Sequence, residues 1–381
     1  MPAQKLNVVM LGGKGVGKSS LMAVLYNSLK TDLQETPLIF EALNDTADQL
    51  EILYDRLMDF GYTGKPLDGI KDTTDPVEYE FQLAPRNTLD LGMDPDFSLL
   101  ITFTDYPGEY IRTNQEFVRD KIAHASAVLI AIDTPALMEE QFLHERMNAT
   151  HYFSSLLRSV FGATTAPRLV LLTPIKCERW LQSTEDTKSM YRKIKNGPYH
   201  DLLDNLAQMK AQAPGESVEK AYVAVVITPI QTVGSILFSR FDRDTQGRPV
   251  HVWQKKAPDA PFAPVDCDQP LRYLMGFLVK QHLEHQRSIE AHLESIGEAF
   301  EKGNILQGVI RVIQLPAKIL GQVINRIAKY FGYDEFWSTW FGELIDFFAG
   351  NEGFRQAIEA FSKKVKRLPP FDIIQGEHLI A

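Results

Sequence analysis

The segment from Gly12 to Ser19 has the residue types and the spacing of a phosphate-binding loop. It reads Gly-Gly-Lys-Gly-Val-Gly-Lys-Ser and matches the pattern G-x-x-x-x-G-K-S/T in full. Glycines let backbone N–H groups turn inward around the phosphates of a nucleotide, while Lys18 contacts the β- and γ-phosphates and the Ser19 hydroxyl binds Mg²⁺. The predicted nucleotide contacts in this segment are Gly12, Gly13, Lys14, Gly15, Val16, Gly17, Lys18, Ser19 and Ser20.

A second candidate site lies at residues 105–109, which read Asp-Tyr-Pro-Gly-Glu directly after an apolar run at residues 98–104. A carboxylate at the carboxyl end of a buried strand can hold Mg²⁺ opposite the hydroxyl of a phosphate loop, so Asp105 and Ser19 are predicted metal ligands. The backbone N–H of Gly108 is then available to contact the γ-phosphate. Taken alone, these residues also fit a Pro-Gly turn that leaves a strand, and it is the upstream loop that favours the functional interpretation.

Together, residues 12–19 and 105–108 resemble the motifs of Ras-like GTPases, in the translation-factor-related class of P-loop proteins. The Asp-Tyr-Pro-Gly-Glu variant and the long spacing between Lys18 and Asp105 are similar to the bacterial double-GTPase and YcjX-like branches, some of which are associated with bacterial conflict systems. The resemblance covers roughly residues 1–234. It implies a switch that binds GTP or GDP with Mg²⁺ and hydrolyses GTP.

The resemblance also implies a threonine that contacts Mg²⁺ and the γ-phosphate, placed before the second strand of the domain. Thr73 and Thr74 precede the β-rich residues 77–83, and we favour Thr74 as metal ligand and catalytic residue. A polar turn ahead of a strand fits the same residues equally well. Glu109 stands where the family often has a glutamine that orients the attacking water. Glu109 therefore joins Lys18 and Thr74 as a candidate catalytic residue, either orienting water or acting as a base, or else simply faces solvent.

The guanine-recognition motif of the family, N/T-K-x-D, is only partly present. Lys176 and Glu178 have the right spacing after the apolar residues 169–173, and a Glu carboxylate can accept two hydrogen bonds from guanine as Asp does. Ile175 stands where the family has Asn or Thr, and an exposed Lys-Cys-Glu at a helix start is the structural alternative. Thr228, after the last predicted strand, is expected near the base. Two alternatives to a GTPase remain: an ATPase on the same fold, and a scaffold that binds the nucleotide without hydrolysing it.

These motifs need a scaffold that brings the ends of several strands together. Short apolar runs alternate with helical patterns, which predicts a parallel sheet covered by helices. The predicted buried strands are residues 6–11, 98–104, 127–132, 169–172 and 222–227, and the helical stretches include 19–29, 48–60 and 138–161. Residues 77–83 alternate apolar with polar and predict an edge strand. The predicted fold is α/β, a Ras-like P-loop NTPase with a mostly parallel sheet flanked by helices.

The pattern changes after residue 235. Residues 235–243 and 250–255 flank a turn and predict a hairpin, and a long helical pattern follows from about residue 271 to 302. We divide the chain into a GTPase domain at residues 1–300, with its core at 5–235 and its hairpin and closing helix at 235–300, and an all-helical extension at 301–381.

The extension contains a segment, residues 303–331, that is amphipathic and carries basic but no acidic side chains. Such a helix packs against the GTPase domain or a protein partner, whether an effector or a second copy, or lies on a membrane surface. Acidic residues return at Asp334, Glu335, Glu343 and Asp346, which favours packing against protein.

Composition excludes several classes of function. The 381 residues carry a formal net charge of −9, which argues against a sequence-independent nucleic-acid binder. The two cysteines, Cys177 and Cys267, exclude a disulfide framework and suit a reducing compartment. Residues 6–11 are too short an apolar run for a signal peptide, and no apolar stretch reaches the length of a membrane span. We expect a cytoplasmic protein, with peripheral membrane contact left open.

Overall fold

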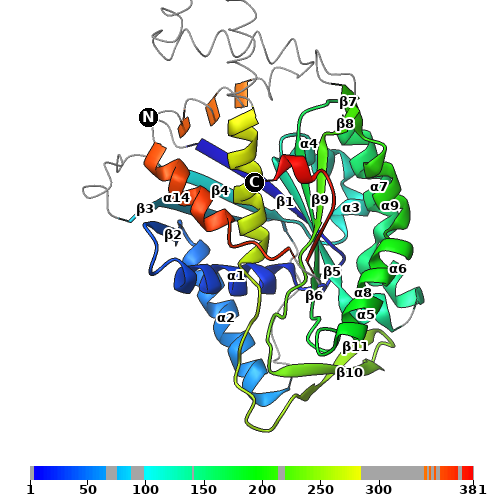
Figure 1. Ribbon diagram of the computed structural model, residues 1–381. Coiled ribbons are helices and arrows are strands. Elements are labelled where there is room, and N and C mark those ends of the chain that lie inside the picture. Colours follow the sequence, from blue (N-terminus) through cyan, green and yellow to red (C-terminus); the bar gives the residue numbers. More distant parts are fainter. Residues whose placement is uncertain are drawn as a thin grey trace, which may run out of the picture.

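The computed structural model describes residues 4–65, 75–86, 98–139, 141–212, 219–284, 339–340, 343–344, 347–348, 352–367 and 371–380. Their largest element is an eight-stranded sheet in the order β12-β9-β6-β5-β1-β4-β3-β2, with helices on both faces (Figure 1). Its strands are β1 (Gln4–Leu11), β2 (Leu38–Ala42), β3 (Val77–Pro85), β4 (Leu99–Asp105), β5 (Ala127–Asp133), β6 (Arg168–Ile175), β9 (Val223–Ile227) and β12 (Asp372–Gln375).

The centre of the sheet is parallel. β1 pairs with β4 and β5, β5 pairs with β6, and β6 pairs with β9, all in the parallel sense. Every residue of β5 and β6 is buried, which is why these strands are continuous apolar runs in the sequence. The register puts Asp105 beside Met10 and Asp133 beside Ile175, so strand ends from β1, β4, β5 and β6 meet at one edge of the sheet. The predicted α/β class and mostly parallel sheet are confirmed.

The prediction that residues 77–83 form an edge strand is wrong. β3 pairs antiparallel with β4 on one side and with β2 on the other. Its polar side chains have specific partners: the Glu78 carboxylate accepts a hydrogen bond from Lys121 Nζ at 3.0 Å, and the Glu80 carboxylate accepts one from the Asn44 amide. The alternation therefore marks one polar face of an inner strand, and the short β2 lies outside it.

Helices cover the two faces of the sheet and bury a separate apolar cluster on each. One cluster lies under α1 (Lys18–Asp32), α2 (Thr46–Thr63), a helix at residues 269–284 and α14 (Glu352–Ser362). The other lies under α4 (Gln115–Ala123), α7 (Thr150–Phe161), α8 (Thr184–Asn196) and α9 (His200–Ala207). Successive residues of β1 alternate between them, with Val8 and Met10 in the first cluster and Val9 and Leu11 in the second.

The helical stretch predicted at residues 138–161 is not continuous. It contains the last residue of α5 (Thr134–Met138), the whole of α6 (Gln141–Asn148) and the whole of α7. Ala149 between α6 and α7 has a φ of 52°, in the left-handed region where an α-helix cannot continue. The Asn148 side chain turns towards β5 instead, where its Oδ1 accepts from the Asp133 N–H at 2.7 Å and its Nδ2 donates to the Asp133 carbonyl at 3.1 Å.

The described residues after 301 belong to the same core as the rest of the chain. α14 buries Phe354, Ile358 and Phe361 in the first cluster, beside Trp340 and Phe348. β12 pairs antiparallel with β9 and is followed by a short 3₁₀ helix, η1 (Glu377–Leu379). The all-helical extension predicted from residue 301 thus holds for α14 but not for β12. The basic segment at residues 303–331 lies outside the described residues.

Three smaller elements complete the fold. The predicted hairpin is confirmed as β10 (Ile236–Arg243) paired antiparallel with β11 (Pro249–Lys255). A second pair joins β7 (Lys210–Gln212) to β8 (Glu219–Ala221). The short helix α3 (Tyr110–Thr113) follows β4.

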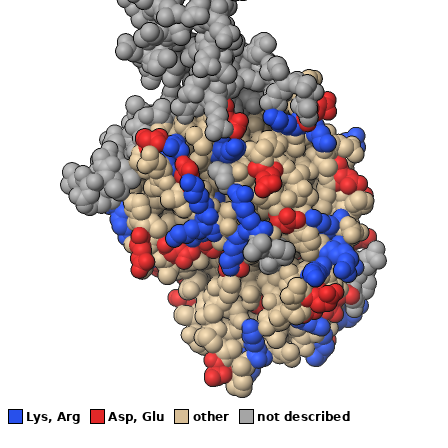
Figure 2. All heavy atoms as spheres, viewed as in Figure 1, with Lys and Arg blue, Asp and Glu red and all other residues tan. Residues whose placement is uncertain are grey.

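Charged side chains of both signs lie together on the face shown in Figure 2. The basic run that follows α14 is an example: Lys363 pairs with Glu359 at 2.8 Å, and Arg367 pairs with Glu377 at 3.6 Å. Among the described residues, no helix has both the length and the apolar character to cross a lipid bilayer.

Candidate functional site

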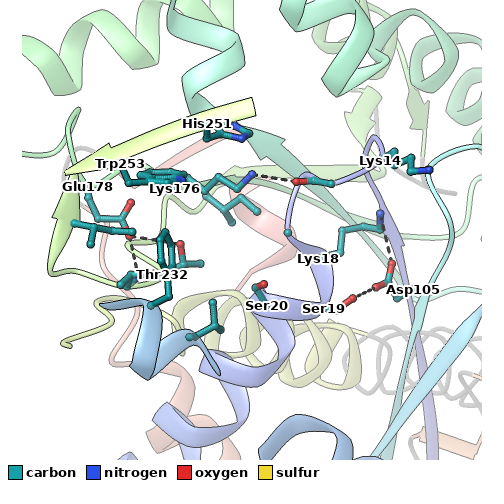
Figure 3. Close-up of a pocket in the computed structure, with 18 of the residues that line it drawn as sticks. Lys14, Lys18, Ser19, Ser20, Asp105, Lys176, Glu178, Thr232, His251 and Trp253 are labelled. Atoms are coloured by element: carbon teal, nitrogen blue, oxygen red, sulfur yellow. Dashed lines mark hydrogen bonds and ion pairs between the residues drawn. The ribbon is translucent and has the colours of Figure 1, made fainter. Parts of the chain in front are cut away.

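A pocket of about 290 Å³ opens where the strand ends meet (Figure 3). Its two ends are lined by different kinds of residue. We call the part formed by residues 12–19 and 105–108 the loop end, and the part formed by residues 57–60, 175–178, 232–236 and 251–253 the aromatic end. The lining residues are Lys14, Gly15, Gly17, Lys18, Ser19, Ser20, Leu57, Phe60, Asp105, Pro107, Gly108, Ile175, Lys176, Glu178, Thr232, Val233, Ile236, His251 and Trp253.

Glycines shape the loop end, because close approaches and left-handed backbone leave no room for side chains. Gly15 and Gly17 have φ values of 72° and 113°. A Cβ on Gly13 would lie 1.5 Å from the Met147 carbonyl oxygen at the end of α6, so the loop rests directly on that backbone. A Cβ on Gly108 would lie 2.3 Å from the Lys14 nitrogen. The loop after β4 is therefore seated on the β1–α1 loop.

Asp105 comes together with Lys18 and Ser19 at the loop end, although it lies 86 residues after Ser19 in the chain. The Lys18 ammonium lies 3.5 Å from Asp105 Oδ1, and the Ser19 hydroxyl donates to Asp105 Oδ2 at 2.8 Å. Both charged groups are almost fully buried. Burial raises the pKa of Asp105, and the Lys18 charge and the Ser19 hydrogen bond oppose that rise. The carboxylate thus lies in a place that favours a neighbouring cation.

Other predicted contacts lie around this centre. Ser20 lines the pocket, whereas Val16 is buried beneath the loop. The Lys14 ammonium lies 3.6 Å from the Glu109 carboxylate, with both side chains more than half exposed. The pocket is lined by Lys14 but not by Glu109. Thr73 and Thr74 fall outside the described residues.

Lys176 links the aromatic end to the loop end. Its backbone is left-handed, with a φ of 58°, and its ammonium donates to the Gly15 carbonyl at 3.0 Å and to Asp133 Oδ2 at 2.6 Å. Figure 3 shows Lys176 and Lys18 approaching the loop from different sides. Asp133 is fully buried and also accepts the Ala136 N–H at 2.9 Å. Burial alone would raise the pKa of Asp133, but Lys176 and His251 outweigh it and hold that pKa well below its usual range.

Glu178 brings a buried carboxylate to the aromatic end. Its Oε1 accepts the backbone N–H of Val233 at 2.8 Å and of Gly234 at 3.3 Å. Its Oε2 is also buried, yet it has no hydrogen-bond partner among the described residues. Burial raises the pKa of Glu178, and the hydrogen bond from Val233 opposes that rise. Glu178 thus brings to the pocket lining a buried carboxylate with one oxygen held by the turn at Val233 and Gly234 and the other unpaired among the described residues.

Thr228 takes a different place from the one the sequence suggested. It is fully buried, and its hydroxyl lies 3.0 Å from the hydroxyl of Thr173 under the sheet edge, away from the lining of the pocket. Thr232 and Val233, a few residues further along, line the pocket instead. Gly234, which has a φ of 76°, is the one sequence signal that marks this turn.

The sequence does not predict the aromatic side chains that form one wall of the pocket. Trp253 of β11 lies at 6.0 Å from Phe60 of α2, measured between ring centroids, with the rings edge to face. His251 stacks on Trp253 at 5.5 Å with an interplanar angle of 16°. Neither strand nor helix periodicity distinguishes these residues from ordinary core aromatics, because only the tertiary contacts bring them to the pocket.

No protein-family model matches this chain, and no curated protein matches it. The chemistry of the site therefore follows from its own geometry. In the part of the chain that the structure describes, no group of three or more His, Cys, Asp or Glu side chains is placed to hold a metal ion by itself.

Proposed function

We propose that the protein is a GTP-binding and GTP-hydrolysing switch with a P-loop NTPase fold, and that the pocket holds the nucleotide with Mg²⁺. The observation that carries the proposal is the cluster of buried Lys18 and Asp105 with half-buried Ser19 at the glycine-built loop between β1 and α1. A buried cation, a buried carboxylate and a hydroxyl at a helix N-terminus form the complement of a polyphosphate with a divalent cation.

The loop end suits the phosphates. α1 begins at Lys18, so the positive end of its dipole lies at the loop end of the pocket, beside the Lys18 ammonium. The backbone of residues 12–17 supplies further donors at the same place. We assign the α- and β-phosphates to the loop amides and the β- and γ-phosphates to Lys18, with Gly108 N–H next to the γ-phosphate.

Ser19 and Asp105 fit Mg²⁺. Mg²⁺ keeps several waters and takes few protein ligands besides the phosphates, so two oxygens from the chain are enough. The Ser19 hydroxyl and the Asp105 carboxylate, 2.8 Å apart, supply them, and Thr74 is the proposed third ligand. When bound, Mg²⁺ neutralises charge that develops on the phosphate oxygens. Lys18 does the same from the chain itself.

The aromatic end suits guanine better than adenine. Glu178 Oε2 is a buried acceptor without a partner among the described residues. Oε1 already accepts the Val233 and Gly234 N–H groups, so it is Oε2 that would accept one of guanine's two adjacent donors, the ring N–H or the exocyclic amine, whereas adenine presents a ring nitrogen acceptor at the matching position. A carboxylate therefore pairs with guanine and repels adenine.

The proposal is tested by measuring GDP and GTP binding to the purified full chain by calorimetry, with ATP as competitor. We expect GTP and GDP to bind, ATP to compete at least about tenfold less well, and Lys18→Ala to weaken binding about a hundredfold. Lys30→Ala is the matched control, because Lys30 is an exposed cation on the same helix that pairs with Glu51. Undiminished affinity in Lys18→Ala would overturn the assignment, and preference for ATP would replace GTPase by ATPase.

A nucleotide-binding scaffold that does not hydrolyse is the second candidate. It is favoured by the pairing of Glu109 with Lys14 at 3.6 Å, which directs the only carboxylate proposed to handle water away from the pocket lining. Phosphate release in a single turnover, with and without liposomes, separates the two. Release above the rate of Lys18→Ala supports the GTPase, and the absence of release supports the scaffold.

The output of the switch is proposed to pass through the C-terminal part of the chain, to a protein partner or a second copy, in a bacterial cytoplasm. The described residues of that part support a mechanical link, since α14 and β12 pack on the same sheet whose strand ends form the pocket.

A further inference from the structure

The β10–β11 hairpin brings two side chains to the aromatic end that belong to no phosphate- or base-binding motif. In the antiparallel register His251 lies opposite Phe241 and Trp253 lies opposite Phe238. Both His251 and Trp253 line the pocket, and both come from β11 (Figure 3). The hairpin therefore closes the side of the pocket that the strand ends leave open.

The hairpin is held at its base. The Ser235 hydroxyl donates to the Gly61 carbonyl at 2.8 Å, and the Lys255 ammonium donates to the same carbonyl at 2.8 Å. Both bonds join the start of β10 and the end of β11 to the last turn of α2. The turn of the hairpin, at residues 244–247, is largely exposed and has open space around Gly247. One end of the hairpin is thus fixed to a helix and the other is not.

A second attachment lies between these ends. His251 Nε2 is 3.0 Å from Asp133 Oδ2, the same carboxylate that accepts the Lys176 ammonium at 2.6 Å. Because Asp133 is ionised, Nε2 carries the proton and donates. Asp133 is completely buried and only 14% of the His251 side chain is exposed, so water competes weakly for this bond. The bond ties the hairpin to the residue that fixes Lys176 on the loop.

We propose that the β10–β11 hairpin is a flap over the base of the bound nucleotide, in which Trp253 is the wall against the purine ring and His251 is a positioning residue that holds the flap closed through Asp133. The inference rests on the function proposed above and extends it to the residues that hold and release the base. Since the flap covers the base, opening of the His251–Asp133 bond removes one of the contacts that keep the hairpin over the base and so speeds release of the nucleotide.

The role of Trp253 is tested with two probes, GDP and inorganic tripolyphosphate, which share phosphates but not the base. We expect Trp253→Leu to weaken GDP about tenfold and to leave tripolyphosphate unchanged, because contact with an aromatic ring is lost only by the base. Trp180→Phe is the matched control: Trp180 stacks on Phe238 of the same hairpin at 5.9 Å but does not line the pocket.

The outcomes separate the flap from the nucleotide site itself. Lys18-dependent GDP binding that Trp253→Leu leaves intact overturns the flap alone. A protein that binds neither probe, or binds both without Lys18, overturns the nucleotide site and the flap with it. Equal weakening of GDP and tripolyphosphate by Trp253→Leu also overturns the flap, since it indicates a general loss of structure.

The role of His251 is tested by the release rate of a fluorescent N-methylanthraniloyl-GDP. His251→Phe keeps a ring against Trp253 but has no donor for Asp133, whereas His251→Gln keeps a donor. We expect release about tenfold faster in His251→Phe, near the original rate in His251→Gln, and the same tripolyphosphate affinity in both. Thermal unfolding identifies a variant that fails to fold. Equal release rates in the two folded variants would contradict the role of His251 in holding the flap closed.

Discussion

The two ends of the pocket are built by different means. The loop end comes from two short segments, residues 12–19 and 105–108, and its shape is set by backbone contacts that require glycine. The aromatic end comes from α2, residues 175–178 and 232–236, and the hairpin, and its shape is set by side chains that meet only in the folded chain. Substitutions at the loop end should therefore affect every ligand, and those at the aromatic end only ligands that carry a base.

Gly13→Ala should give the largest effect, and a harmless substitution would show that backbone contacts requiring glycine do not shape the loop end. The new Cβ would lie 1.5 Å from the Met147 carbonyl oxygen, so the loop or α6 must shift. We expect a loss of about 4 kcal/mol in the free energy of unfolding and loss of GDP and tripolyphosphate binding. Gly247→Ala is the control: nothing lies within 4 Å of its Cβ, and only its φ of 74° is unfavourable, which costs about 1 kcal/mol. Denaturant unfolding measures both.

Lowering the pH should reduce the stability of the protein through His144, which lies behind the Asp133 backbone that supports the aromatic end. His144 Nδ1 lies 2.9 Å from the amide nitrogen of Asn148, the residue that holds the Asp133 backbone. Burial, with a smaller effect of Lys193, lowers the pKa of His144 from 6.5 to about 4. His144 therefore binds a proton below pH ~6.5 in the unfolded chain but only below pH ~4 in the folded chain. The free energy of unfolding falls as the pH falls between these two values.

His144 should account for about 3 kcal/mol of that fall. Urea unfolding of His144→Gln between pH 7 and pH 4 should show a shallower decline than the original protein. His200→Gln, at an exposed histidine that pairs with Asp204, should leave the decline unchanged. Parallel declines in the original protein and in His144→Gln would show that another group governs this pH range.

Glu178→Gln should change recognition of the base and leave phosphate binding at the loop end unaffected. The amide oxygen can still accept the Val233 N–H, while an amide NH₂ group, which only donates, replaces the buried Oε2 acceptor. We expect GDP to bind about tenfold more weakly and tripolyphosphate to bind as before. Because burial of the Glu178 carboxylate is unfavourable, the free energy of unfolding should not fall. Glu185→Gln, in the exposed first turn of α8, is the control for a lost negative charge.

Glu109→Gln should give the smallest effect, although Glu109 lies beside the loop end. Its ion pair with Lys14 spans 3.6 Å, and both side chains are more than half exposed, so solvent screens the attraction. We expect the free energy of unfolding to change by less than about 0.5 kcal/mol and GDP affinity by less than about twofold. A large drop in GDP affinity would place Glu109 within the pocket's chemistry.

The sequence predicted the loop end because its constraints are local. Gly15, Gly17 and Lys18 act within one turn of chain, and the apolar runs on either side indicated the strands that carry them. Asp105 was predicted correctly beside Ser19 because parallel strand ends share one edge of a sheet. The break at Ala149 was missed because alanine gives no signal of a left-handed backbone.

The aromatic end was predicted only in part, because its residues meet through long-range contacts. Lys176 and Glu178, which their spacing predicts, line the pocket, whereas Thr228 does not and Thr232 and Val233 line it instead. His251 and Trp253 had no local signature. The sequence does carry a signal for β12: residues 371–375 include three apolar side chains, Phe371, Ile373 and Ile374, and lie between two prolines and Gly376, which is typical of a short strand.

The pairing of β12 with β9 affects how the protein emerges from the ribosome. β9 ends at Ile227, but β12, the strand that covers its outer side, is complete only when the ribosome has reached Gln375. At about 5–20 residues per second, the interval lasts on the order of ten seconds. Throughout that time the nascent chain presents an apolar strand with open backbone hydrogen-bonding groups, a natural target for chaperones and a risk for association between neighbouring polysomes.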